Sequence, residues 1–155
     1  MEIGGDFMLG FLVPCLAAFC ACAGFSLMYN LRGAYIPASA MCGAFSWAVY
    51  LIAARTGGSI MPYFFAGAAV ALYSEIAAIV LRAPATVFLI PGIIPTVPGL
   101  TVYRAMAECM SHNTAGFIEK GIETFKIGGA IAAGVIVCTA LFRLVRAVYQ
   151  KHNKE

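Results

Sequence analysis

Long apolar runs, separated by short polar connections, limit the possible folds of this chain more than any other feature does. A helix that crosses the hydrocarbon core of a bilayer needs about 20 apolar residues. Hydrophobic residues make up 62% of the sequence and charged residues 11%, a balance that a soluble globule cannot bury. We therefore predict one all-α integral membrane domain with about five transmembrane helices. The expected spans cover about residues 7–28, 38–54, 61–81, 86–110 and 127–142, and a basic tail covers residues 143–155.

The first run follows the acids Glu2 and Asp6 instead of a positive segment, and it is too long for the core of a cleaved signal peptide. We expect it to stay in the protein as a span. Small residues are frequent in the runs and favour close helix packing in lipid, among them Gly128, Gly129 and Gly134. Most of the six cysteines lie in apolar runs without C-x-x-C spacing, which is typical of small buried hydrophobes.

The connection before the last span has a two-faced helical pattern. Phe117, Ile118, Ile122 and Phe125 share one face, while acidic and basic residues at 119, 120 and 123 occupy the other. This pattern predicts a short helix lying at the membrane interface.

Lysine and arginine are unevenly distributed between the connections. The positive-inside rule assigns the side with more of them to the cytoplasm. With the N-terminus outside, the cytoplasmic side holds Arg32, Arg82, Arg143, Arg146, Lys151 and Lys154, against Arg55, Lys120 and Lys126 outside. We expect the C-terminus inside, provided that the fourth segment crosses the membrane.

A proline and glycine run interrupts the fourth segment, so it cannot be one straight helix. Proline has no N–H to return to the carbonyl four residues earlier. Pro91, Pro95 and Pro98 therefore free the carbonyls of Val87, Pro91 and Ile94. An unsatisfied carbonyl in hydrocarbon costs several kcal/mol. We expect water, a neighbouring chain or a substrate to serve these groups.

Broken helices near mid-membrane form the substrate sites of many secondary transporters. Gly99 opens the second half of the broken segment, and its N–H groups, with the hydroxyls of Thr96 and Thr101, suit a carboxylate. The candidate substrate-binding residues are Pro91, Gly92, Pro95, Thr96, Pro98, Gly99, Tyr103 and Arg104. The alternative is a kink that serves packing alone.

Arg104 lies one turn after Gly99, and its planar guanidinium can bind a carboxylate through two hydrogen bonds. Snorkelling to an interface is the alternative role for this arginine. Tyr103 and Tyr73 are candidates for the same cavity, although tyrosines are also ordinary packing and interface residues.

Glu75 is the only acid deep within a predicted span. It precedes Arg82 by seven residues, which places it roughly 10 Å inside the helix end. An ionised acid there is costly, so it must be protonated, paired with a cation such as Arg104 or Arg82, or exposed to water. A carboxyl whose protonation changes as its access to water changes is a candidate proton carrier. The alternative is that Glu75 is a structural partner for an arginine or a backbone N–H.

Other chemistries have little support. We assign neither His112 nor His152 to a metal site, and no serine has a nucleophile motif. We predict no enzyme activity, no metal and no cofactor. The net charge is only +3 and the basic residues concentrate in the tail, so nucleic-acid binding is not expected.

Residues 73–106 resemble the threonine/serine exporter family, and more narrowly its small five-span subunit. That subunit is similar to the C-terminal half of the fused exporters and to the smaller protein of a bacterial succinate exporter pair. The segments that carry the resemblance are Tyr73–Ala78, Arg82–Leu89, Pro91–Gly99 and Tyr103–Met106.

The resemblance implies a bacterial inner-membrane secondary exporter of threonine, serine or a dicarboxylate, working with a larger partner subunit of the family. Because five spans alone enclose little, we expect that partner, further copies of this chain, or both to complete the pathway. It also implies an acid at the position of Glu75. A membrane scaffold that stabilises a partner without transport is the alternative function.

Overall fold

The computed structural model describes residues 3–152, and their side chains over residues 9–148. These residues form helices only, with no strand among them, which confirms the predicted all-α class. The elements are α1 (Ile3–Met28), α2 (Tyr35–Ala54), α3 (Met61–Leu81), α4 (Thr86–Ile93), the 3₁₀ helix η1 (Ile94–Thr96), α5 (Gly99–Met110) and α6 (Thr114–His152).

Local sequence explains where several helices begin and end. Pro37 lies in the first turn of α2 and Pro62 in the first turn of α3, where the missing N–H has no intrahelical acceptor to lose. Arg82 ends α3 in the left-handed conformation, with φ of 51°, and Pro84 follows it. The bounds of α3 coincide with those of the predicted run.

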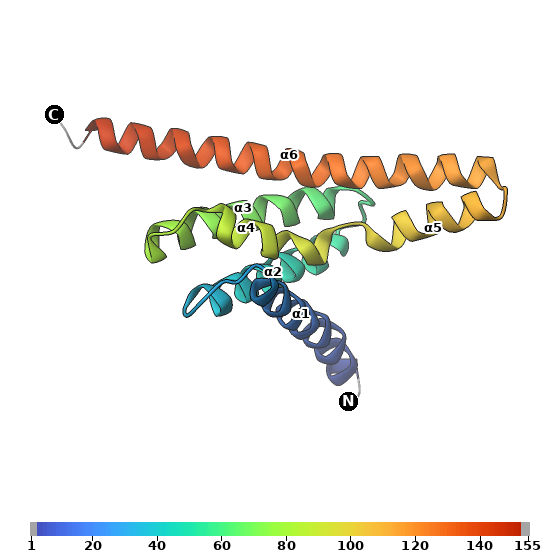
Figure 1. Ribbon diagram of the computed structural model, residues 1–155, viewed down its shortest axis with the longest axis horizontal. Coiled ribbons are helices and arrows are strands. Elements are labelled where there is room, and N and C mark those ends of the chain that lie inside the picture. The colour runs from blue at the N-terminus through green and yellow to red at the C-terminus, as the bar shows by residue number, and fades with distance from the viewer. Residues whose placement is uncertain (1–2, 153–155) are drawn as a thin grey trace.

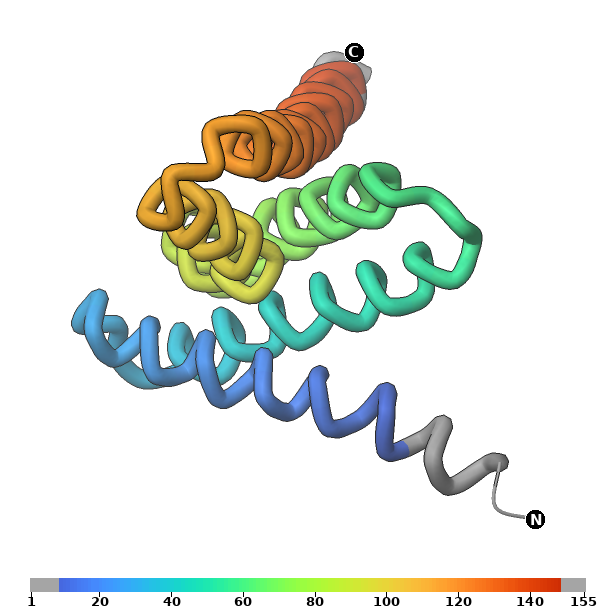
Figure 2. The backbone as a smooth tube through the Cα atoms, turned by 90° about the vertical axis from the view of Figure 1, so that its right-hand side faces the viewer, coloured from blue at the N-terminus to red at the C-terminus, as the bar shows by residue number. Residues whose placement is uncertain are grey.

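The helices stack in layers (Figures 1 and 2). α1 packs on α2, α2 packs on α3 and α4, and α6 lies across α3 and α5 on the opposite side. α1 begins and α6 ends at opposite ends of the bundle (Figure 1). The central position of α3 and α4 leaves α1 and α6 with wide faces that contact no other part of the described chain.

Glycines allow α3 and α6 to approach closely. A Cβ added to Gly134 would lie 2.2 Å from the carbonyl oxygen of Phe64, and one added to Gly67 would lie 2.5 Å from that of Ile131. The predicted packing role is therefore confirmed for Gly134. Gly128 and Gly129 have nothing within 4 Å of an added Cβ, so this contact does not need them.

The predicted short interfacial helix is wrong as a separate element. Residues 117–125 form part of α6, a single helix of 39 residues. No proline occurs after Thr114 to interrupt the backbone, and α5 packs against α6 after the turn that joins them. At 1.5 Å per residue α6 is roughly 58 Å long, well beyond the thickness of a hydrocarbon core.

Four helices in the described chain are long and apolar enough to cross a membrane, namely α1, α2, α3 and α6. The pair α4–η1 and α5 also passes as one broken element, with a bend of 52°. The chain continues forward through this bend instead of doubling back (Figure 1). The predicted break in the fourth segment is therefore confirmed.

Candidate functional site

The break lies at Val97 and Pro98, between η1 and α5. Val97 is extended, with ψ of 132°, and α5 begins at Gly99 as the sequence indicates. The N–H of Gly99 already donates to the carbonyl of Val97, over 2.7 Å. The first helical bond of α5 comes from Val102 to Pro98, so the N–H groups of Leu100 and Thr101 have no backbone acceptor within the described residues.

Groups of the same chain donate hydrogen bonds to the carbonyls freed by the prolines. This corrects the expectation that water, a substrate or another chain would do so. Ser39 Oγ on α2 donates to the carbonyl of Val87 over 3.3 Å. Cys22 Sγ on α1 donates to the carbonyl of Pro91 over 3.1 Å. The Ile94 carbonyl accepts from the N–H of Val97 over 3.2 Å.

Two of the cysteines thus do more than fill space. Cys22 and Cys42 are buried, and Cys42 Sγ lies 3.9 Å from the carbonyl of Val70. All six cysteines are free thiols, and Cys20 and Cys109 are exposed. The expectation of buried hydrophobes therefore describes only part of the set.

A cavity of about 520 Å³ opens beside the break, and we call it the break cavity. Five elements line it, namely α2, α3, η1, α5 and α6, so residues from distant parts of the chain come together there. They include Trp47 and Tyr50 of α2, Tyr63 of α3, Pro95, Thr96, Pro98 and Gly99 of the break, Thr101 and Arg104 of α5, and Glu123 of α6.

Opposite charges face the break cavity. Arg104 comes from α5 and Glu123 from α6. The carboxylate of Glu123 also accepts from Lys120 Nζ over 3.0 Å, and Lys120 lies 3.5 Å from Glu119. One lysine between two acids leaves this group with a net negative charge. The cavity therefore offers a cation on one wall and an anionic group on another.

Aromatic side chains form a further wall of the break cavity. The rings of Trp47 and Tyr50 stack with their centroids 5.0 Å apart, and the rings of Tyr50 and Tyr63 are 4.9 Å apart. The Tyr50 hydroxyl donates to that of Tyr63 over 3.3 Å. The indole Nε1 of Trp47 is buried and has no hydrogen-bond partner within the described residues. A ligand with an acceptor atom would satisfy this N–H.

The sequence interpretation missed Trp47, Tyr50, Tyr63 and Glu123. Trp47 and Tyr50 are three residues apart and therefore share a helix face, which is a local signal. Nothing local associates that face with Glu123, which lies more than 70 residues later in the sequence.

Some predicted substrate residues do not line the cavity. Pro91 and Gly92 are buried between helices, and a Cβ on Gly92 would lie 2.5 Å from Cys42 Sγ. Tyr103 is 70% exposed on the outer face of α5. Thr96 lines the cavity but is only 1% exposed, and its hydroxyl donates to the carbonyl of Ile93.

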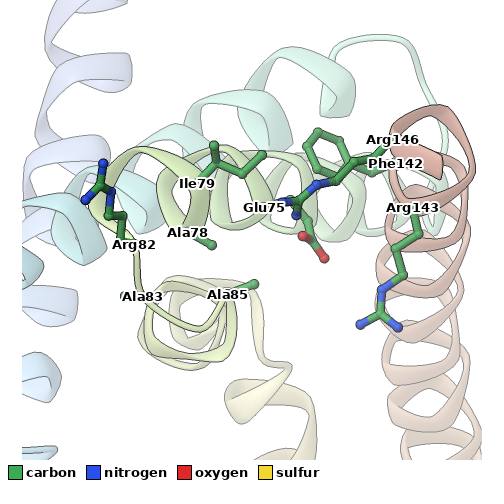
Figure 3. A pocket seen from close by; sticks show the side chains of 9 residues that line it. All are labelled: Glu75, Ala78, Ile79, Arg82, Ala83, Ala85, Phe142, Arg143 and Arg146. Carbon is green, nitrogen blue, oxygen red and sulfur yellow. The ribbon is translucent and has the colours of Figure 1, made fainter. Parts of the chain in front are cut away.

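Glu75 lies apart from the break, in a second cavity of about 470 Å³ that we call the Glu75 cavity. Its charged lining residues are Glu75, Arg82, Arg143 and Arg146 (Figure 3). Glu75 is 12 residues after Tyr63 on α3, which separates the two cavities by roughly 18 Å along the helix. The ion pairs among the described side chains are both made by Lys120. The structure therefore does not show the expected pairing of Glu75 with Arg104 or Arg82.

Comparison with known proteins decides the family. A family model described as Threonine/Serine exporter, ThrE, matches residues 14–141. The chain belongs to the threonine/serine exporter family. The resemblance that the sequence carries over residues 73–106 is confirmed, and the match extends it over most of the chain. No curated protein and no solved structure matches this chain.

In this exporter-family chain the two cavities lie at opposite ends of the apolar stretch of α6. Glu123 and Ile127 line the break cavity, whereas Arg143 lines the Glu75 cavity. Glu123 and Arg143 are 20 residues apart, or roughly 30 Å, which equals the thickness of a hydrocarbon core. The break cavity therefore lies beside one end of the apolar stretch of α6, while the break itself lies midway along the α4–η1–α5 segment.

No metal site is visible in the part of this exporter-family chain that the structure describes. No group of three His, Cys, Asp or Glu side chains there is arranged to hold a metal ion.

Proposed function

We propose that this chain is the small subunit of a proton-coupled secondary exporter of small carboxylate-bearing metabolites. The break cavity carries this proposal, because it joins a broken helix, an arginine and an unsatisfied indole N–H in one space. The guanidinium of Arg104 and the free N–H groups of α5 suit a carboxylate.

The charges of the break cavity favour an amino acid such as threonine or serine over a dicarboxylate such as succinate. An amino acid carries one carboxylate and one ammonium group. Arg104 suits the first, while Glu123 and the aromatic wall of Trp47, Tyr50 and Tyr63 suit the second. A dicarboxylate would leave one of its charges close to Glu123, which is unfavourable.

We also propose that a larger subunit of the same family, or further copies of this chain, covers the exposed faces. Large apolar side chains are exposed along α1 and α6, among them Leu16, Leu27, Ile136 and Leu141. Both lipid and a protein partner are suitable cover for such faces.

For localisation we propose a bacterial inner membrane, with the N-terminus outside and the C-terminus in the cytoplasm. The α1–α2 connection, the α3–α4 connection and the end of α6 lie at one end of the bundle (Figure 1). These segments contain Arg32, Arg82, Arg143 and Arg146, so the basic residues of three separate segments face one side.

Direct binding and transport test the proposal together. Trp47 is the only tryptophan and lines the break cavity, so its fluorescence reports on that cavity. We expect threonine or serine to change the emission of the purified protein, and succinate to change it less. In liposomes that contain the protein and its larger partner, we expect counterflow of labelled threonine. Unchanged threonine efflux from cells that lack both proteins would contradict the proposal.

Glu75 is the proposed proton carrier. The charged and titratable groups that face it are Arg82, Arg143 and Arg146, with Cys138 nearby on α6. Protonation of Glu75 would change the charge of a cavity that is otherwise positive. We expect Glu75→Gln to remove the dependence of transport on a pH gradient while leaving counterflow at equal pH. Full proton coupling in this variant would rule out the carrier role.

A non-transporting scaffold is the second candidate, and the internal hydrogen bonds of the break favour it. Ser39 and Cys22 satisfy the freed carbonyls without any ligand, as a purely structural kink requires. In liposomes that contain this chain and its larger partner, counterflow that survives replacement of Pro95, Pro98 and Arg104 together would support the scaffold over the exporter, because the partner would then form the substrate site.

A further inference from the structure

The Glu75 cavity holds an excess of positive charge that the fold does not neutralise. Three arginines line it against one acid, which leaves two positive charges in excess. Arg143 and Arg146 are three residues apart, so they project from the same face of α6. Figure 3 shows the carboxylate of Glu75 and the guanidinium of Arg143 turned toward the space between α3, α6 and the start of α4.

None of these groups makes an ion pair with another. The ion pairs among side chains 9–148 involve only Lys120 with Glu119 and Glu123. The Glu75 cavity also lies next to apolar surface, because Phe142, Ile79 and three alanines complete its lining. Arg82, Arg143 and Arg146 are also exposed, so an anion can reach their guanidinium groups from outside the bundle.

We propose that the Glu75 cavity is a second binding site, for a small oxyanion that carries a carboxylate or a phosphate group. Arg143 and Arg146 bind the oxyanion oxygens, since a guanidinium presents paired donors to either group. Arg82 lies at the other edge of the cavity and adds long-range attraction. An ionised Glu75 competes with the oxyanion for the same guanidinium groups.

This site is distinct from the break cavity and does not depend on transport. Arg104 belongs to the break cavity, while Arg82, Arg143 and Arg146 belong to the Glu75 cavity. The oxyanion has two sources with the same chemistry: a soluble metabolite or the phosphate of an anionic lipid. The choice of lipid in the experiment separates them.

Chemical protection of arginine tests the proposal in one sample. Protein in phosphatidylcholine nanodiscs is treated with phenylglyoxal, and peptide mass spectrometry gives the modification rate of each arginine. We expect inorganic phosphate or succinate to slow the modification of Arg143 and Arg146 about fivefold or more relative to Arg32. Arg32 is an internal control, because it is exposed and does not line the cavity, and the α1–α2 connection that contains it lies at the same end of the bundle (Figure 1).

The lipid arm repeats the measurement in phosphatidylglycerol nanodiscs without added anion. Protection of Arg143 and Arg146 there identifies the lipid phosphate as an occupant, whereas protection that needs added phosphate or succinate identifies a soluble one. Rates for Arg143 and Arg146 that fall no more than the rate for Arg32 when phosphate, succinate or phosphatidylglycerol is present would overturn the proposal.

Variants show whether the protection comes from this cavity. Arg143→Gln is expected to weaken the protection of Arg146 by roughly tenfold in anion concentration, because one charge-assisted contact is lost. Glu75→Gln is expected to strengthen it, because the competing carboxylate is removed. Arg32→Gln is the matched control and leaves the protection unchanged. Protection of Arg104 by threonine reports separately on the break cavity, so failure of the proposed exporter function is distinguishable from failure of this site.

Discussion

Arg104→Gln is expected to reduce transport by roughly 10- to 150-fold at low substrate concentration. A charge-assisted hydrogen bond to a carboxylate contributes about 1.5–3 kcal/mol, which converts to this range of affinity. Glutamine keeps much of the length of the side chain but loses the charge and the paired donors. Counterflow of labelled threonine in liposomes is the measurement, with the amount of reconstituted protein determined in the same preparation.

Tyr103→Phe supplies the matched control for Arg104. Tyr103 is the preceding residue of α5, but it is 70% exposed and does not line the break cavity. The transport rate of the Tyr103→Phe variant is expected to stay close to that of the unmodified protein. A second variant, Arg104→Lys, keeps the charge without the planar fork, and we expect it to recover only part of the activity. Full transport by Arg104→Gln would exclude Arg104 from substrate binding.

Gly134→Val is expected to destabilise the protein by about 3 kcal/mol, because extra side-chain volume is forced between two helices. An added Cβ already meets the carbonyl oxygen of Phe64 at 2.2 Å and the backbone nitrogen of Ala68 at 2.9 Å. Backbone atoms cannot rotate away as a side chain does, so α3 and α6 must separate. The midpoint of thermal unfolding in detergent measures the effect.

Gly129→Val is the control for this packing prediction. Gly129 lies in the same helix, and an added Cβ has nothing within 4 Å. Helix propensity changes alike in both variants, so the difference between them isolates the contact with α3. Equal midpoints for the two valine variants would show that the close approach of α3 and α6 contributes nothing to stability.

The same contact links stability to both cavities. α3 carries Tyr63 of the break cavity and Glu75 of the Glu75 cavity, and α6 carries Glu123 and Arg143. Separation of the two helices at Gly134 would therefore move the walls of both cavities at once. A partially folded Gly134→Val protein is expected to lose binding in both.

Sequence alone determined the membrane class, the ends of several helices and the position of the break. These features depend on short-range physics: the apolar runs need lipid, and a proline lacks the N–H of a regular helix wherever it occurs. The glycine that opens α5 and the proline in the first turn of α3 could be recognised for the same reason. The family resemblance also rested on contiguous residues.

Tertiary structure alone decided which residues share a cavity. Arg104 lines one cavity with Glu123 and Trp47, and Glu75 lines another with Arg143, across sequence separations that no local pattern encodes. It also decided that Ser39 and Cys22, 48 and 69 residues away, satisfy the carbonyls that the prolines free. A missing hydrogen bond is a local fact, but its replacement depends on which helix packs beside it.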